Sequence, residues 1–167
     1  MLKPQDMLVG LSLVVEGPLG YERLSHATGL ALSQAHQSVQ RLKASRLVDA
    51  DREVNRANFE EFLVHGVPYC WPGELSSGPV NGMPTAGAAP GLVDRFPVPD
   101  MAPRVWPTEE GLVRGLGLVP LCPSVPAAAA RSPRLYKLLA LVDALRVGAA
   151  RDKNLAAAEL AAELRQR

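Results

Sequence analysis

Hydrophobic positions recur at helical spacing at both ends of this chain, and the pattern breaks down between them. In residues 1–65, apolar side chains return every three or four positions in several short runs. In residues 131–167 the same spacing forms two longer runs separated by Gly148. Residues 66–130 contain 12 of the 15 prolines and 9 of the 14 glycines. The pattern predicts a mainly α protein with an irregular Pro/Gly-rich segment between its helical ends.

The N-terminal 65 residues divide into short elements with recognisable ends. A proline near the start favours a first helical turn, and glycines and an asparagine are common at helix termini. The expected order is a helix beginning at Pro4 and stopped by residues 16–20, a helix over 21–29 closed by Gly29, a helix ending near Ser45, a small hairpin over 46–55, and a helix capped by Asn55.

The helix expected from residue 32 onward has an unusual polar face. Its apolar positions Ala35, Val39 and Leu42 form one stripe, while the other face carries hydroxyls, amides, an imidazole and a guanidinium but no carboxylate. A solvated helix face usually mixes Glu with Lys. DNA phosphates repel carboxylates, whereas Gln pairs with adenine and Arg with guanine. This composition favours a helix that faces nucleic acid.

The N-terminal segment resembles bacterial winged helix-turn-helix regulators of the MarR-like kind. The resemblance is carried by Gly29, Leu30, Ala31, Ser33, Arg41-Leu42 and Leu47-Val48, which follow the pattern of the turn, the second helix and the entry to the hairpin. The chain departs from that pattern at Arg46, where glycine is usual, and at Ser25, where alanine is commoner. The resemblance covers about 65 residues, and it implies sequence-specific DNA binding with the helix after Gly29 in the major groove.

Under this interpretation nine side chains are candidates for DNA contact. Ser33, Gln34 and Gln37 are expected to point into the groove, and His36, Ser38 and Arg41 to reach bases or backbone. Lys43, Arg23 and Arg52 are expected to contact phosphates, which position a protein on DNA without specifying sequence.

The C-terminal helices carry an apolar stripe wider than one side of a small domain needs. The stripe is expected to mediate dimerisation through Leu135, Leu138, Leu139, Val142 and Leu145. The alternative is that it packs within one chain on Phe59, Phe62 and Trp71. The predicted organisation is therefore a DNA-binding domain (1–65), an ordered connecting segment (66–130) and dimerisation helices (131–167).

The connecting segment is expected to be ordered because it holds both tryptophans, Trp71 and Trp106, together with Tyr69 and Phe96. Disordered segments are usually poor in aromatic residues. Either the segment forms a sensory pocket or it braces the dimer, and bracing is the simpler interpretation.

Composition and charge narrow the function further. The net charge of the 167 residues is +1, so any nucleic-acid binding depends on where the cations are placed. Cys70 and Cys122 lie far apart, which predicts neither a zinc site nor a disulfide and fits a cytoplasmic protein. No cofactor or metal is expected. The absence of a long apolar run argues against a membrane span.

The sequence leaves two candidate functions. The first is a homodimeric transcriptional regulator, expected to be a repressor, on an inverted-repeat operator. The second is a protein-interaction or antitoxin-like subunit that binds a partner through the middle and C-terminal segments, with the winged helix as a scaffold or an autoregulatory device. An enzyme is not expected, since His65 and Cys70 have no third group to orient them.

Overall fold

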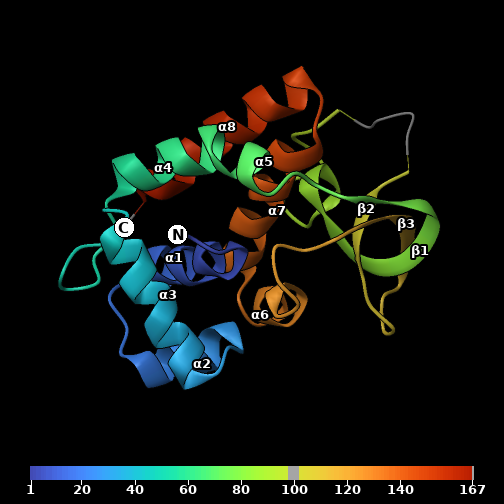
Figure 1. Ribbon diagram of the computed structural model, residues 1–167. Helices are drawn as coiled ribbons and strands as arrows, with labels where there is room; N and C mark the ends of the chain where they lie inside the picture. Colours follow the sequence, from blue (N-terminus) through green and yellow to red (C-terminus); the bar gives the residue numbers. More distant parts are fainter. Residues whose placement is uncertain (98–101, 167) are drawn as a thin grey trace.

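A computed structural model describes residues 1–97 and 102–166 of the chain (Figure 1). Within these residues the fold is mainly helical, with one small sheet. The elements in chain order are α1 (Pro4–Glu16), α2 (Tyr21–Thr28), α3 (Leu32–Ala44), α4 (Arg56–His65), α5 (Val67–Cys70), β1 (Leu75–Thr85), the 3-10 helix η1 (Ala86–Ala88), β2 (Arg104–Pro107), β3 (Val113–Leu118), α6 (Val125–Arg131), α7 (Pro133–Val147) and α8 (Ala150–Arg165).

The N-terminal elements follow the sequence prediction closely. Gly29 ends α2 in the left-handed conformation, with φ 71°, and its N–H donates to the carbonyl of Ser25. The expected hairpin is reduced to a single antiparallel bridge between Val48 and Val54. Asn55 caps α4 as predicted, because its side-chain oxygen accepts from the N–H of Asn58.

Two helices form the centre of the molecule and are buried on nearly all sides. Helix α1 is buried from Asp6 to Val14, and it contacts α2, α3 and α7. Helix α7 contacts α1, α4, α5, α6, α8 and η1, and is buried from Leu138 to Arg146. Figure 1 shows α7 running between the helical part of the molecule and the sheet. A helix covered all round needs apolar residues on every face, which explains the broad stripe of α7.

The expectation that five apolar side chains of α7 mediate dimerisation is wrong. Leu135, Leu138, Leu139, Val142 and Leu145 are each no more than 3% exposed within the single chain. They belong to the same core as Phe59, Phe62 and Trp71, in agreement with the alternative arrangement. These side chains pack on α7's own neighbours and are not available to a second copy.

The connecting segment is more regular than its composition suggests. Within the described residues it contributes α5, β1, β2, β3 and most of α6. Strand β1 pairs antiparallel with both β2 and β3, which pair parallel with each other and close the sheet. The expectation of a mostly irregular segment is therefore wrong. Gly82 on β1 has a packing role in this sheet. A Cβ at this position would lie 2.1 Å from the carbonyl oxygen of Trp106, so a larger residue would push β1 and β2 apart.

A buried polar cluster fastens the sheet to α7. The Asp143 carboxylate on α7 accepts hydrogen bonds from Thr85 Oγ1 at 2.8 Å and Trp106 Nε1 at 2.7 Å, and it pairs with Arg146 Nη1 at 2.7 Å. Arg146 Nε also donates to the carbonyl of Trp71 at 2.9 Å. Burial raises the pKa of Asp143, although Arg146 and the hydrogen bonds oppose the shift. The connecting segment thus braces α7 of its own chain.

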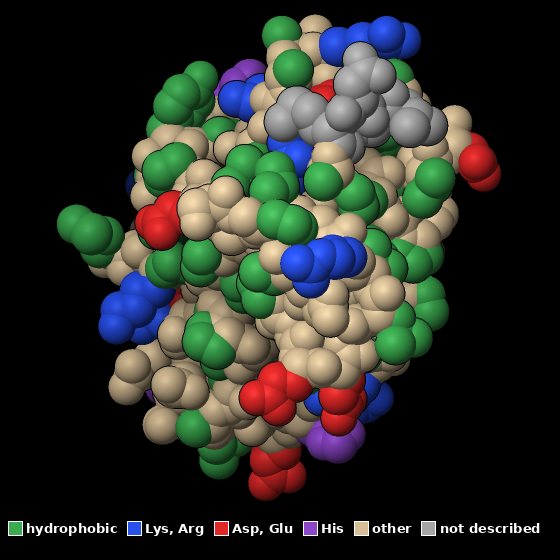
Figure 2. Space-filling view, turned by 90° about the vertical axis from the view of Figure 1, so that its right-hand side faces the viewer, with side chains coloured by type: hydrophobic (Ala, Val, Ile, Leu, Met, Phe, Trp, Pro, Cys, Tyr) green, Lys and Arg blue, Asp and Glu red, His purple; other side chains and the backbone are tan. Residues whose placement is uncertain are grey.

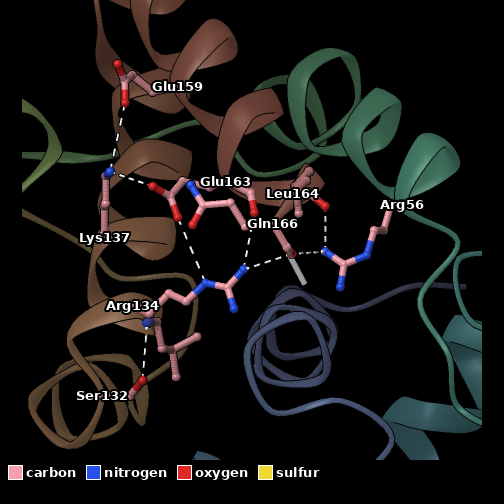
Figure 3. Close-up of polar contacts among 9 residues, drawn as sticks. Arg56, Ser132, Arg134, Lys137, Glu159, Glu163, Leu164 and Gln166 are labelled. Atoms are coloured by element: carbon pink, nitrogen blue, oxygen red, sulfur yellow. Dashed lines mark hydrogen bonds and ion pairs between the residues drawn. The ribbon is translucent and has the colours of Figure 1, made fainter.

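A second polar cluster holds the end of α8 against α7 and α4 (Figure 3). Arg134 Nη2 donates to the carbonyls of Glu163 and Gln166, each at 3.2 Å, and Arg56 Nη1 donates to that of Gln166 at 3.2 Å. Lys137 Nζ pairs with the Glu163 carboxylate at 2.6 Å. The last carbonyls of a helix lack internal partners, so these arginines satisfy them and dock α8.

The hydrophobic core is continuous across the predicted segment boundaries. It includes side chains from α1, α3 and α4 as well as α6, α7 and α8. The boundary expected after residue 130 falls inside α6. Among the described residues, no helix has the length and apolar character needed to cross a membrane.

Candidate nucleic-acid interface

Helix α3 has one buried face and one face open to solvent. Its contacts are made with α1 and α2, and Figure 1 shows it on the side of the molecule away from the sheet. Ala35, Val39 and Leu42 are fully buried, as the apolar stripe predicted. The exposed residues of the helix are Leu32, Ser33, Gln34, His36, Gln37, Gln40 and Ala44. The exposed residues of α3 therefore include no Lys, Arg, Asp or Glu.

The middle of this open face is a row of four side chains. Ser33, Gln37, Gln40 and Ala44 follow one another at spacings of four, three and four residues, which places them along one side of a helix. Gln40 and Ala44 were not among the candidates taken from the sequence. Their signal is the i, i+4, i+7, i+11 spacing, which becomes readable once the buried face is known.

Ser38 and Arg41 do not belong to the open face, so their expected role in DNA contact is wrong. Ser38 is fully buried. Arg41 turns toward α1, where its Nε and Nη2 donate to the two oxygens of Asp6 at 2.8 and 2.7 Å. Arg41 Nη2 also donates to Ser38 Oγ at 3.2 Å. The hydrogen bond to Asp6 raises the pKa of Arg41, and the pair locks α3 to α1.

Gln34 is exposed, but its side chain makes a hydrogen bond at the start of its own helix. Its Oε1 accepts a hydrogen bond from the N–H of Ala31 at 3.1 Å, at the start of α3. This bond satisfies one of the backbone donors that a helix N-terminus leaves unpaired. The carboxamide nitrogen of Gln34 keeps its donors, while one of the two lone pairs of the oxygen is used and the group is held at the start of the helix.

Three side chains connect α2, α3 and the hairpin. The rings of Tyr21 and His36 lie 4.8 Å apart, and the guanidinium of Arg52 lies over the Tyr21 ring at 5.3 Å from its centroid. Arg52 adopts a left-handed backbone conformation, with φ 69°. Tyr21, which sequence reasoning did not select, thus positions two of the predicted contact residues.

An open groove of about 750 Å³ lies between the beginnings of α2 and α3. Arg23, Leu32, Ser33 and His36 contribute to its lining, together with Tyr21. Arg23 is exposed, so the structure leaves it available for the phosphate contact predicted from the sequence.

The cations at the other end of α3 are arranged differently from the prediction. Lys43 Nζ donates to the carbonyl of Ala50 at 2.7 Å and holds the hairpin against the helix. Arg46 is exposed, and its backbone adopts the left-handed conformation with φ 58°. It stands at the position where the resemblance would place glycine. The hairpin itself exposes three carboxylates, at Asp49, Asp51 and Glu53. Arg23 and Arg46 are therefore exposed cations, whereas the hairpin tip carries exposed carboxylates.

The remaining candidate chemistry is sparse. Among the described residues, no group of three or more His, Cys, Asp or Glu side chains is placed to hold a metal ion. Cys70 is exposed, whereas Cys122 is buried and its desolvation raises the thiol pKa.

Comparisons of the chain with protein-family models, with curated proteins and with solved structures find no match.

Proposed function

We propose that this protein binds double-stranded DNA in a sequence-specific manner and regulates transcription. In the proposal, α2 and α3 form a helix-turn-helix, the bridge between Val48 and Val54 forms a small wing, and α3 enters the major groove. The single observation that carries it is the open face of α3, which combines hydroxyl and carboxamide groups and contains no acid.

The dimensions and charges of α3 support this assignment. A helix of 13 residues is about 20 Å long and fits the major groove. Arg23 and Arg46 are both exposed, one on α2 and the other just past the end of α3. Such cations supply the salt-dependent, sequence-independent part of binding, while the amides between them supply specificity.

A homodimer acting as a repressor on an inverted repeat remains part of the proposal. Two copies would place two α3 helices about one helical turn apart on DNA. The surface that joins them must lie outside the buried stripe of α7, since those five side chains face the core of one chain.

The test is selection from a pool of duplexes with a randomised centre, followed by titration of the selected duplex by fluorescence anisotropy. We expect Gln37→Ala to weaken binding to the selected duplex about tenfold, because one base contact contributes ~1–3 kcal/mol. Arg23→Ala and Arg46→Ala should weaken binding to every duplex alike and lower the salt slope by about one each. Asn154→Ala, an exposed amide on α8, is the matched control and should bind as the wild type does.

Two results would contradict the proposal. One is selection that enriches no sequence. The other is binding that Gln37→Ala and Asn154→Ala affect equally.

A second function, binding of a partner protein, is favoured by the surface around the sheet. Figure 2 shows this side of the molecule, where apolar side chains recur among scattered charged ones. Leu112 is 98% exposed, and Val119 and Leu75 are 52% and 42% exposed. If the protein is an antitoxin-like subunit, the product of a neighbouring gene should copurify with it, and Val119→Asp should abolish the association without altering the circular dichroism spectrum.

A further inference from the structure

We infer that α3 reads adenine and thymine and does not read guanine, so that the half-site it contacts is centred on A·T base pairs. The inference rests on the proposed DNA binding. It concerns which base pairs the open face of α3 can recognise, and it follows from which side chains the fold leaves free.

The fold withdraws the two cations of α3 that would read guanine. Bidentate contact of Arg or Lys with O6 and N7 is the commonest specific contact to guanine. In α3 the two cations are Arg41 and Lys43. Arg41 is bound through two nitrogens to Asp6, whose carboxylate is fully buried. Turning Arg41 into the groove would leave that carboxylate without a counter-charge, and the loss would exceed what one base contact returns.

Lys43 is also engaged, although less firmly. Its amine donates to the carbonyl of Ala50 at 2.7 Å. Helical geometry places it about 100° around the helix from Ala44, away from the middle of the open face. Neither cation of α3 therefore stands where the major-groove edges of the bases would lie.

Three of the four side chains in the middle of the open face match adenine and thymine. Gln37 and Gln40 are exposed carboxamides, and a carboxamide offers a donor and an acceptor side by side. Adenine presents the complementary pair, the N6 amino donor and the N7 acceptor, in the major groove. Ala44 ends the same row, and a small apolar side chain suits the C5 methyl group of thymine.

Gln34 is not equivalent to these two glutamines. Because its Oε1 accepts from the N–H of Ala31, the carboxamide is held at the start of α3 and is not free to align its donor and acceptor with adenine. Two bidentate contacts to adenine, from Gln37 and Gln40, are thus expected in each half-site. Because the two residues lie within one helical turn of each other, the two adenines should belong to adjacent or nearly adjacent base pairs.

The test combines selection of the preferred half-site with a change of specificity. The wild type should enrich adenine at two nearby positions, and replacing either A·T pair by G·C should weaken binding about tenfold. Gln37→Ala should abolish the preference at one of these positions and preserve it at the other. Gln37→Arg places a free guanidinium in the row, so it should shift the preference at the same position to guanine.

Gln40→Ala and Gln40→Arg make the same comparison at the second position, and Asn154→Ala on α8 is the control that should change neither. Both glutamines are exposed, so these variants should fold, which circular dichroism checks.

The possible failures are distinguishable. Enrichment of guanine at the positions that respond to Gln37 or Gln40, in the wild type, would overturn this inference while leaving DNA binding in place. A guanine preference that disappears in Arg41→Lys would overturn it as well, since Arg41 would then reach the bases. Selection without any enriched sequence would overturn the proposed function, and this inference with it.

Discussion

Arg41 shows how a distant residue decides what a side chain does. On the helix alone, its guanidinium stands among polar groups and is a natural candidate for a base contact. Asp6, 35 positions earlier, accepts two of its hydrogen bonds and turns it inward. The same carboxylate also accepts from the N–H of Lys3 at 2.7 Å, so it caps the beginning of α1 and anchors α3.

Asp6→Asn should lower the free energy of unfolding by about 3 kcal/mol, because it leaves the Arg41 guanidinium without a counter-charge. Urea denaturation at neutral pH measures the change. Asp51→Asn, at an exposed position of the hairpin, is the control and should stay within about 0.5 kcal/mol of the wild type. Equal effects of the two substitutions would show that the pair between Asp6 and Arg41 contributes little to stability.

Among the elements, α1 illustrates how a helix of unremarkable sequence becomes the support of the candidate interface. It packs against α3 on one side and against α7 on another, and therefore fixes where the open face of α3 points. Its middle contains Gly10, a poor helix former. The reason is packing, since a Cβ at Gly10 would lie 2.6 Å from Cζ of the Phe59 ring on α4.

Gly10→Ala should therefore destabilise the protein by about 1–2 kcal/mol, although alanine favours a helix by roughly 1 kcal/mol. Adding Phe59→Leu should recover part of the loss, and a double-mutant cycle in urea measures the coupling. Gly20→Ala is the matched control, because a Cβ there meets nothing within 4 Å. Stabilisation by Gly10→Ala alone would contradict the tight contact.

At the scale of the whole molecule, the continuous core joins the candidate DNA-binding segment to the C-terminal helices. The α1 side chains that pack against α7 would be exposed to water if residues 1–65 stood alone. Exposing such an apolar surface is unfavourable in proportion to its area. We therefore expect residues 1–65 to depend on α7 for their stability.

We expect a single cooperative unfolding transition, with coincident curves from far-ultraviolet circular dichroism and from tryptophan fluorescence. The first signal reports mainly the helices. The second reports Trp71 and Trp106, which lie beside α7 and in the sheet. A fragment of residues 1–65 should lack stable tertiary structure. Two separate transitions, or a folded fragment, would contradict this view of the core.

The sequence alone determined the local elements of the N-terminal segment. Gly29, Asn55 and the stripe of Ala35, Val39 and Leu42 act through neighbours a few residues away, so their roles are visible in the spacing. The acid-free face of α3 is a property of composition and needs no coordinates. The strands were hidden because the glycines and prolines of β1 lower its apparent strand preference.

Only the tertiary structure decided which polar groups of α3 remain free and which apolar stripe is covered. Arg41 turns inward because α1 brings Asp6 to it, and the buried Ser38 accepts a hydrogen bond from the same guanidinium. Leu138 and Val142 face the core because five other helices and η1 surround α7. Helical periodicity fixes the direction in which a side chain leaves its own helix, but the partner it meets there comes from a distant part of the chain and is set by packing.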